Sequence, residues 1–169
     1  MKKYFLIGLV AVFCLCGHSH AQDRAADLMK QAQESLDSQS YIKARYLFLQ
    51  AYNAFASEGK YEQAVACNVK ACALYYRENY YKEAFELLGR ADQTVTDGEK
   101  KAGKQLPALR YPIIKERMRM YLNIGKTGNA KTQLDLLEES AKKAASDSLG
   151  TDLLYTKAAY FYTLRQNDK

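Results

Sequence analysis

A four-residue pattern repeated every 20 residues is the feature that most constrains the fold of this chain. Tyrosine, two variable residues and alanine follow one another from Tyr41, from Tyr61 and again from Tyr81. Seven residues after its own alanine, each copy is followed by a second one: Ala51, Ala71 and Ala91. A degenerate copy, with Ala130 and Leu137, comes later. Small residues two turns apart let helix axes approach closely, so the pattern predicts closely packed, repeated helices.

The rest of the chain also has helical periodicity, because apolar residues recur three and four positions apart from Asp23 onward. Turn-forming clusters divide this region into about seven predicted helices of about 14 to 20 residues. These clusters span residues 37–40, 57–60, 77–79, 96–98, 125–128 and 146–148. Pro107 and Pro112 interrupt the chain, and no alternating run of β-branched residues indicates a strand. The sequence therefore predicts an all-α fold.

The start of the chain has the pattern of a cleavable secretory signal peptide. Two lysines precede an apolar run from Tyr4 to Cys16, and small residues lead to a cleavage site after Ala21. The run of about 13 residues is shorter than the ~20 of a membrane-spanning helix, so a retained anchor is the less favoured alternative. We expect residues 1–21 to be a signal peptide and residues 22–169 to form one helical repeat domain. The mature protein would be exported, either periplasmic or secreted, with no membrane span.

Cleavage of that segment would limit the chemistry left to the chain. Both histidines (His18 and His20) and two of the four cysteines lie within it, and the formal net charge falls from +6 to +4 with its two lysines. Without histidine, Ser-His and Cys-His nucleophile pairs cannot form, and the commonest nitrogen ligand of metals is missing. No phosphate-binding glycine loop is present. We expect no enzyme activity, no cofactor and no metal, and sparse basic residues disfavour a nucleic-acid partner.

Two groups of residues have a purely structural interpretation. Cys67 and Cys72 lie five residues apart on one predicted helix and point about 140° away from each other. They cannot form a disulfide without breaking that helix, so we expect two small buried residues in a helix interface. Lys100, Lys101 and Lys104 are interpreted as part of a solvated, glycine-containing loop.

The repeated pattern resembles the tetratricopeptide family. The turn and second helix of that family contain glycine, aspartate or asparagine, then tyrosine, two variable residues and alanine. Residues 59–64 and 79–84 match this pattern well, and residues 39–44 match it less closely. The resemblance covers most of the chain from residue 23, although two helices take about 40 residues here and about 34 in the family. It implies an α-solenoid, a right-handed superhelix of antiparallel helix pairs.

The helices can be paired in two ways. Pairing from Asp23 leaves the last helix without a partner, whereas pairing from Tyr41 makes residues 23–37 a cap. In the first case the terminal helix exposes an apolar face. Either the protein then oligomerises through this helix, or the chain is a truncated part of a longer protein.

The resemblance further implies a scaffold that binds a protein or peptide. With pairing from Asp23, the concave positions of the family fall on Gln33, Tyr76, Lys115, Arg119 and Lys157. Lys115 and Arg119 share a helix face, and a cationic groove favours an acidic or carboxylate-bearing partner. The alternative is an extracytoplasmic sensory or regulatory domain of a signalling protein. A cluster of tyrosines at one turn is interpreted as filling between helices: Tyr75, Tyr76, Tyr80 and Tyr81.

Overall fold

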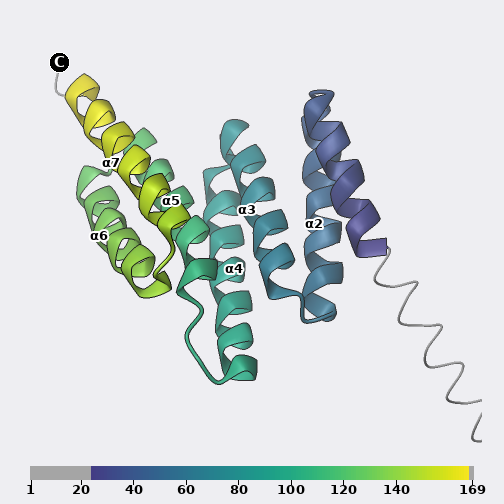
Figure 1. Cartoon of the computed structure of the whole chain (residues 1–169). Helices are drawn as coiled ribbons and strands as arrows, with labels where there is room; N and C mark the ends of the chain where they lie inside the picture. Colours follow the sequence, from purple (N-terminus) through teal and green to yellow (C-terminus); the bar gives the residue numbers. More distant parts are fainter. Residues whose placement is uncertain (1–23, 168–169) are drawn as a thin grey trace, which may run out of the picture.

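The computed structural model of the chain describes residues 24–167, which form seven helices and no strand (Figure 1). Within the described part, the first helix covers residues 24–37. The others are α2 (Tyr41–Ser57), α3 (Tyr61–Arg77), α4 (Tyr81–Ala102), α5 (Pro107–Asn123), α6 (Thr127–Ala144) and α7 (Asp147–Asn167). The all-α prediction is confirmed, while the predicted signal peptide lies outside the described residues. No helix between residues 24 and 167 is both long enough and apolar enough to cross a bilayer.

One turn geometry joins successive helices four times. Two residues before the next helix begins, the backbone is left-handed at Gln39, Gly59, Asn79 and Gly125, with φ between 60° and 73°. The amide of the following residue then donates to the carbonyl five residues back, over 2.8 to 3.0 Å in all four turns. This is the Schellman termination, which satisfies free carbonyls at a helix end. Helices α2, α3 and α4 begin 20 residues apart, and so do α5, α6 and α7.

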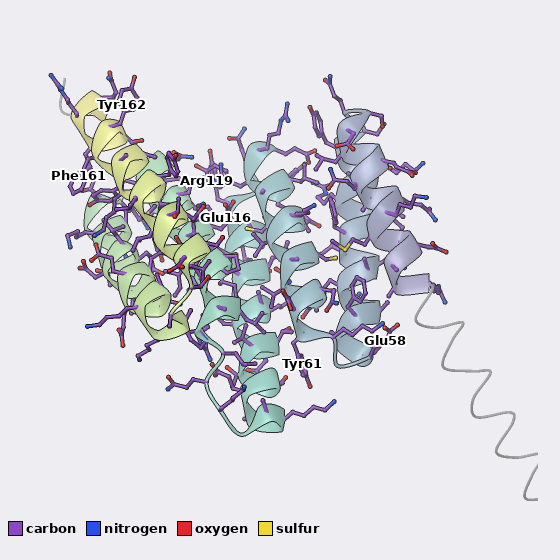
Figure 2. All side chains as sticks on the ribbon, viewed as in Figure 1. Glu58, Tyr61, Glu116, Arg119, Phe161 and Tyr162 are labelled. Atoms are coloured by element: carbon purple, nitrogen blue, oxygen red, sulfur yellow. The ribbon has the colours of Figure 1, made fainter. Side chains whose placement is uncertain are left out.

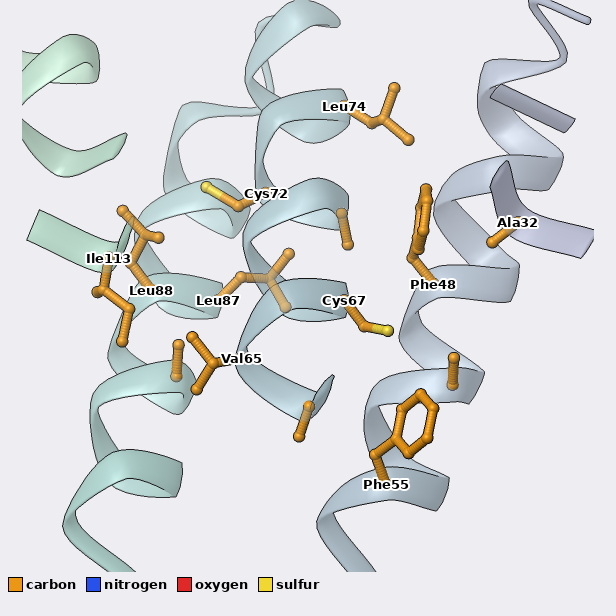
Figure 3. Packing of buried hydrophobic residues seen from close by; sticks show 14 of the residues in the cluster. Ala32, Phe48, Phe55, Val65, Cys67, Cys72, Leu74, Leu87, Leu88 and Ile113 are labelled. Atoms are coloured by element: carbon orange, nitrogen blue, oxygen red, sulfur yellow. The ribbon is translucent and has the colours of Figure 1, made fainter. Parts of the chain in front are cut away.

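The repeated alanines of the sequence pattern are buried in the contacts between helices. All of them have no exposed surface: Ala44, Ala51, Ala64, Ala71, Ala84, Ala91 and Ala130. Figure 3 shows the larger side chains that fill the remaining space, with Phe48 and Phe55 of α2 on one side of α3 and Leu88 of α4 on the other. The packing role expected for the pattern is therefore confirmed.

Helix pairing follows the scheme that starts at the first helix. α3 packs extensively along α4, and α5 along α6, whereas the α4–α5 and α6–α7 contacts are more limited. Between alternate helices, α3 contacts α5 and α5 contacts α7; no contact of that extent joins α2 with α4 or α4 with α6 in the described helices. The odd-numbered helices therefore lie together on one face of the stack, and α7 has no following helix in the described residues.

The predicted break at residues 96–98 is wrong, because α4 continues through it to Ala102. Gly98 is buried there, and a Cβ atom added to it would lie 3.0 Å from the ring of Tyr61 in α3. The glycine serves close packing between two helices instead of ending one, and the left-handed terminator is Gly103. In the same way Pro112 does not interrupt the chain but lies inside α5, which Pro107 begins.

The predicted lysine loop is also wrong in part. Lys100 and Lys101 belong to the last turn of α4, and the connection to α5 is held by the preceding Glu99. Its carboxylate accepts hydrogen bonds from the Leu106 amide (3.0 Å) and from Arg110 Nε (3.1 Å). The side-chain hydrogen bond from Arg110 lowers the pKa of Glu99. The turn from α4 to α5 is thus fixed by an ion pair.

The two cysteines of the described chain are buried, free thiols, as predicted. The Cys72 thiol donates to the carbonyl of Ala84 (3.4 Å) and lies 3.7 Å from the sulfur of Met120. Burial raises the pKa of Cys67 to about 11 and that of Cys72 to about 12. Both thiols therefore pack as small apolar groups between helices.

Candidate partner-binding surface

The five residues predicted to line a groove all lie on odd-numbered helices, but their cations are already engaged. Lys115 pairs with Asp152 (2.6 Å) and Lys157 with Glu138 (2.8 Å). Arg119 donates to Glu116, its neighbour one turn earlier, through both Nε (3.0 Å) and a terminal nitrogen. The remaining members are Gln33 and Tyr76. An acidic partner at this face would have to compete with three carboxylates of the chain itself.

Lys115 belongs to a network that ties α5 to α7. Its amine and the Tyr111 hydroxyl both donate to Asp152, the hydroxyl over 2.7 Å. Burial works against the charged form of Asp152, yet the bonds from Lys115 and Tyr111 outweigh it and lower its pKa. Burial and the adjacent carboxylate raise the pKa of Tyr111. The network thus holds an ionised carboxylate between two donors and fixes one helix on the other.

Gln33 has a similar structural role at the other end of the stack. Its amide nitrogen donates to Asp37 (2.8 Å), and its amide oxygen accepts from Lys70 of α3 (2.5 Å). These bonds join the first helix to α3. The side chain is therefore committed to contacts within the protein.

Tyr76 and Arg119 are the two predicted residues that the fold brings together. The guanidinium carbon of Arg119 lies 5.4 Å from the centre of the Tyr76 ring, which is within cation–π range. Figure 2 shows Arg119 and Glu116 together on α5. On its other side the Tyr76 ring meets Tyr81, with ring centres 5.1 Å apart and planes inclined by 56°. These contacts lead from the odd-numbered helices to a larger aromatic surface.

That surface forms where α2 begins, α3 ends and α4 begins, and we call it the tyrosine–arginine surface. Arg45 of α2 is stacked on Tyr75 (4.3 Å to the ring centre), lies 5.6 Å from the Tyr80 ring centre and pairs with Glu78. Arg77 is stacked on Tyr41 at 3.9 Å. Its members are Tyr41, Arg45, Tyr46, Tyr75, Tyr76, Arg77, Tyr80, Tyr81 and Arg119.

Several rings of this surface are open to solvent. Tyr46 is 63% exposed, Tyr80 49% and Tyr81 39%, and the neighbouring Ile42 is 70% exposed. A depression of about 840 Å³ lies between α2 and the end of α3, with Tyr46 and Tyr75 in its lining. The surface is therefore both apolar and hollowed, while its arginines are held by stacking and ion pairs.

The interpretation of the clustered tyrosines as filling between helices is thus only half right. Tyr75 and Tyr76 are half-buried, but Tyr80 and Tyr81 face solvent. The density of tyrosine at one turn was a visible signal for a surface. The contribution of α2 was not, because Arg45 and its partner Glu78 lie 33 residues apart in the chain.

Within residues 24–167, no three histidine, cysteine, aspartate or glutamate side chains are placed to hold a metal ion. No family model, no curated protein and no solved structure matches the chain.

Proposed function

We propose that this chain is an exported helical-repeat module of the tetratricopeptide type that binds a protein or peptide and carries out no catalysis. Its helix pairs would continue the right-handed superhelix of that family. Three features support this: the turn repeated four times, the buried alanines at 20-residue spacing, and the contacts between alternate odd-numbered helices. A module of this kind presents side chains on a rigid stack of helices.

The tyrosine–arginine surface is the observation that carries the binding role. Tyrosine and arginine dominate the energetically important residues of protein interfaces, because they combine a large apolar area with polar groups. Here the rings and guanidinium groups are already fixed against each other, with Arg45 between Tyr75 and Tyr80. Fewer side-chain rotamers would be lost when a partner docks. The arginines of the surface also suit an acidic or carboxylate-bearing segment of that partner.

This role is tested by affinity capture of partners from the exported fraction of the source cells, quantified by mass spectrometry. The variant Tyr46→Ser with Tyr80→Ser removes two exposed rings and should lower capture of specific partners at least about tenfold, as expected for interface anchors. Leu136→Ser is the matched control, since Leu136 is also exposed but lies on α6. Equal capture by the wild type and the double tyrosine variant would reject the tyrosine–arginine surface as the binding site.

The groove predicted on the odd-numbered helices is tested by a separate variant, Lys115→Ala with Arg119→Ala. Weaker capture is expected if the partner exchanges for Asp152 and Glu116 as the ligand of these cations. Capture that is unchanged here but lost with the tyrosine variant would restrict the binding site to the tyrosine–arginine surface. Thermal unfolding of each variant separates lost binding from lost folding.

A further inference from the structure

Helix α7 repeats the structure of α5 at a spacing of 40 residues, and burial shows this first. Thr156 and Tyr160 of α7 are buried. Forty residues earlier, Glu116 and Met120 of α5 are buried as well. In both helices these side chains face the part of the stack that precedes them, because Met120 joins the core formed with α3 and α4 and Tyr160 joins the one formed with α6.

A pair of ion pairs fixes the same register independently. Arg117 of α5 pairs with Asp92 of α4 (2.5 Å). Forty residues later, Lys157 of α7 pairs with Glu138 of α6 (2.8 Å). In each case an odd-numbered helix places a cation on an acid of the preceding even-numbered helix. The two helices therefore occupy equivalent places in the repeat.

The equivalence shows what α7 lacks. The face of α5 with Ile114, Met118 and Leu122 is covered by α6, through Ala130, Leu134, Leu137 and Ala141. Forty residues on, these three positions are Leu154, Ala158 and Tyr162 of α7, and all three are exposed. Tyr155 and Phe161 flank them and are 75% and 59% exposed. Figure 2 shows Phe161 and Tyr162 projecting from the end of α7.

We call this face the α7 stripe: Leu154, Tyr155, Ala158, Phe161 and Tyr162. Its residues are spaced three and four apart, so they lie on one side of the helix. Two large residues precede Ala158 by three and four positions, and two follow it by three and four positions. Such an arrangement is self-complementary: when two copies cross antiparallel at Ala158, small residues meet at the crossing and large ones pack on either side.

Charge supports the same orientation. Asp147 lies in the first turn of α7 and Arg165 in its last turn. Antiparallel packing would bring the acidic start of each helix near the basic end of the other, and it would also oppose the two helix dipoles.

From these observations we infer that the protein forms a two-fold dimer in which the α7 stripe packs antiparallel on the α7 stripe of a second copy. Each α7 then takes the place that a following helix would hold in its partner's repeat. The interface is isologous, so it closes at two copies. It goes beyond the proposed binding function and does not depend on it, since the α7 stripe and the tyrosine–arginine surface share no residue.

The mass of the purified full-length protein in analytical ultracentrifugation tests this inference, over protein concentrations from about 1 to 100 µM, because dimers dissociate on dilution. The wild type should sediment as a dimer and Ala158→Glu as a monomer. Ala26→Glu is the matched control, as Ala26 is an exposed helical alanine at the far end of the stack, and it should remain dimeric. A monomeric wild type, or a dimer that persists in Ala158→Glu, would overturn the inference.

Disulfide trapping tests the crossing point directly. In the two-fold arrangement the two Ala158 residues face each other, so Ala158→Cys should form a linked dimer under mild oxidation, while Ala26→Cys should not. The buried Cys67 and Cys72 would not compete. Absence of a link through Cys at position 158, or equal linking at position 26, would contradict the crossing. Partner capture depends on Tyr46 and Tyr80, so failure of the dimer and failure of the binding function are distinguishable.

Discussion

Single buried polar side chains show how the interior of α3 is built. Asn68 has no exposed surface, and neither atom of its amide has a hydrogen-bond partner. Tyr75 and Tyr121 accept the same hydrogen bond in equivalent turns, and this places Asn68 in register with Ile114 of α5. Ile114 packs there against apolar residues of α6. The amide of Asn68 thus occupies a position where the repeat takes an apolar side chain.

Replacing Asn68 with leucine should therefore stabilise the protein. Leucine has a similar size and removes two unsatisfied polar atoms from the interior, which should raise the free energy of unfolding by about 1 to 2 kcal/mol. Urea denaturation measures this value. Asn53→Leu, at an exposed position of α2, is the control and should change stability by less than about 0.5 kcal/mol. A loss of stability in Asn68→Leu would mean that the amide contributes to the fold.

The two thiols predict a dependence of stability on alkaline pH. Their pKa values are about 11 and about 12 in the fold, against an ordinary value of 9.0. Above pH 9 the unfolded chain loses these protons first, so the free energy of unfolding should fall by about 1.4 kcal/mol per pH unit for each thiol. This loss begins near pH 9 and continues towards pH 11.

The measurement compares urea denaturation of the wild type and of Cys67→Ala with Cys72→Ala between pH 8 and 10.5. Other groups titrate in both proteins, so the thiol contribution is the difference between their slopes. Parallel slopes above pH 9 would show that the thiols are accessible to water in the folded protein.

Whole helices were largely predictable from sequence, because their limits depend on local signals. The turns that precede α2, α3, α4 and α6 contain the glycine, asparagine and serine residues that disfavour a continuing helix, and the repeated tyrosine marks the start of three of these helices. The break at residues 96–98 failed because Gly98 is fixed by a ring on another helix. Local propensity carries no information about such a contact.

Two glycines of α4 separate these effects. Gly89 has no atom within 4 Å of an added Cβ, so Gly89→Ala should stabilise the protein by about 1 kcal/mol through helix propensity. Gly98→Ala should give no gain or a loss, because its Cβ would lie 3.0 Å from the Tyr61 ring. Thermal unfolding of both variants measures the contrast. Equal stabilisation by both would show that Gly98 has no packing role.

The repeated turn makes a second prediction for the same scale. Gln39 adopts a left-handed backbone with φ of 60°, which strains a residue with a side chain. Gln39→Gly should raise the free energy of unfolding by about 0.5 to 1 kcal/mol. The converse change, Gly125→Ala, should lower it by about 1 kcal/mol from backbone strain alone, since its Cβ would meet nothing within 4 Å. Opposite signs in urea denaturation are expected, and a loss in Gln39→Gly would contradict the account.

In the whole molecule, binding surfaces arise from contacts that sequence does not reveal. The expected groove residues do lie on the odd-numbered helices, but the acids that neutralise Lys115 and Lys157 come from other helices, 37 and 19 residues away. The stacking of α2 on the end of α3 likewise joins separate repeats. The repeat predicted the scaffold because its signals are local and periodic. Its surface depends on which side chains meet across the stack.

The claim that the tyrosine–arginine surface binds a protein partner is tested most directly by site-specific photocross-linking in the source cells. A photoreactive phenylalanine analogue at position 46, in place of the exposed Tyr46, should give a covalent adduct with one or a few exported proteins. The same analogue in place of Lys100, exposed at the opposite end of α4, should give none of these adducts. Adducts that are absent at position 46, or identical at both positions, would contradict the account.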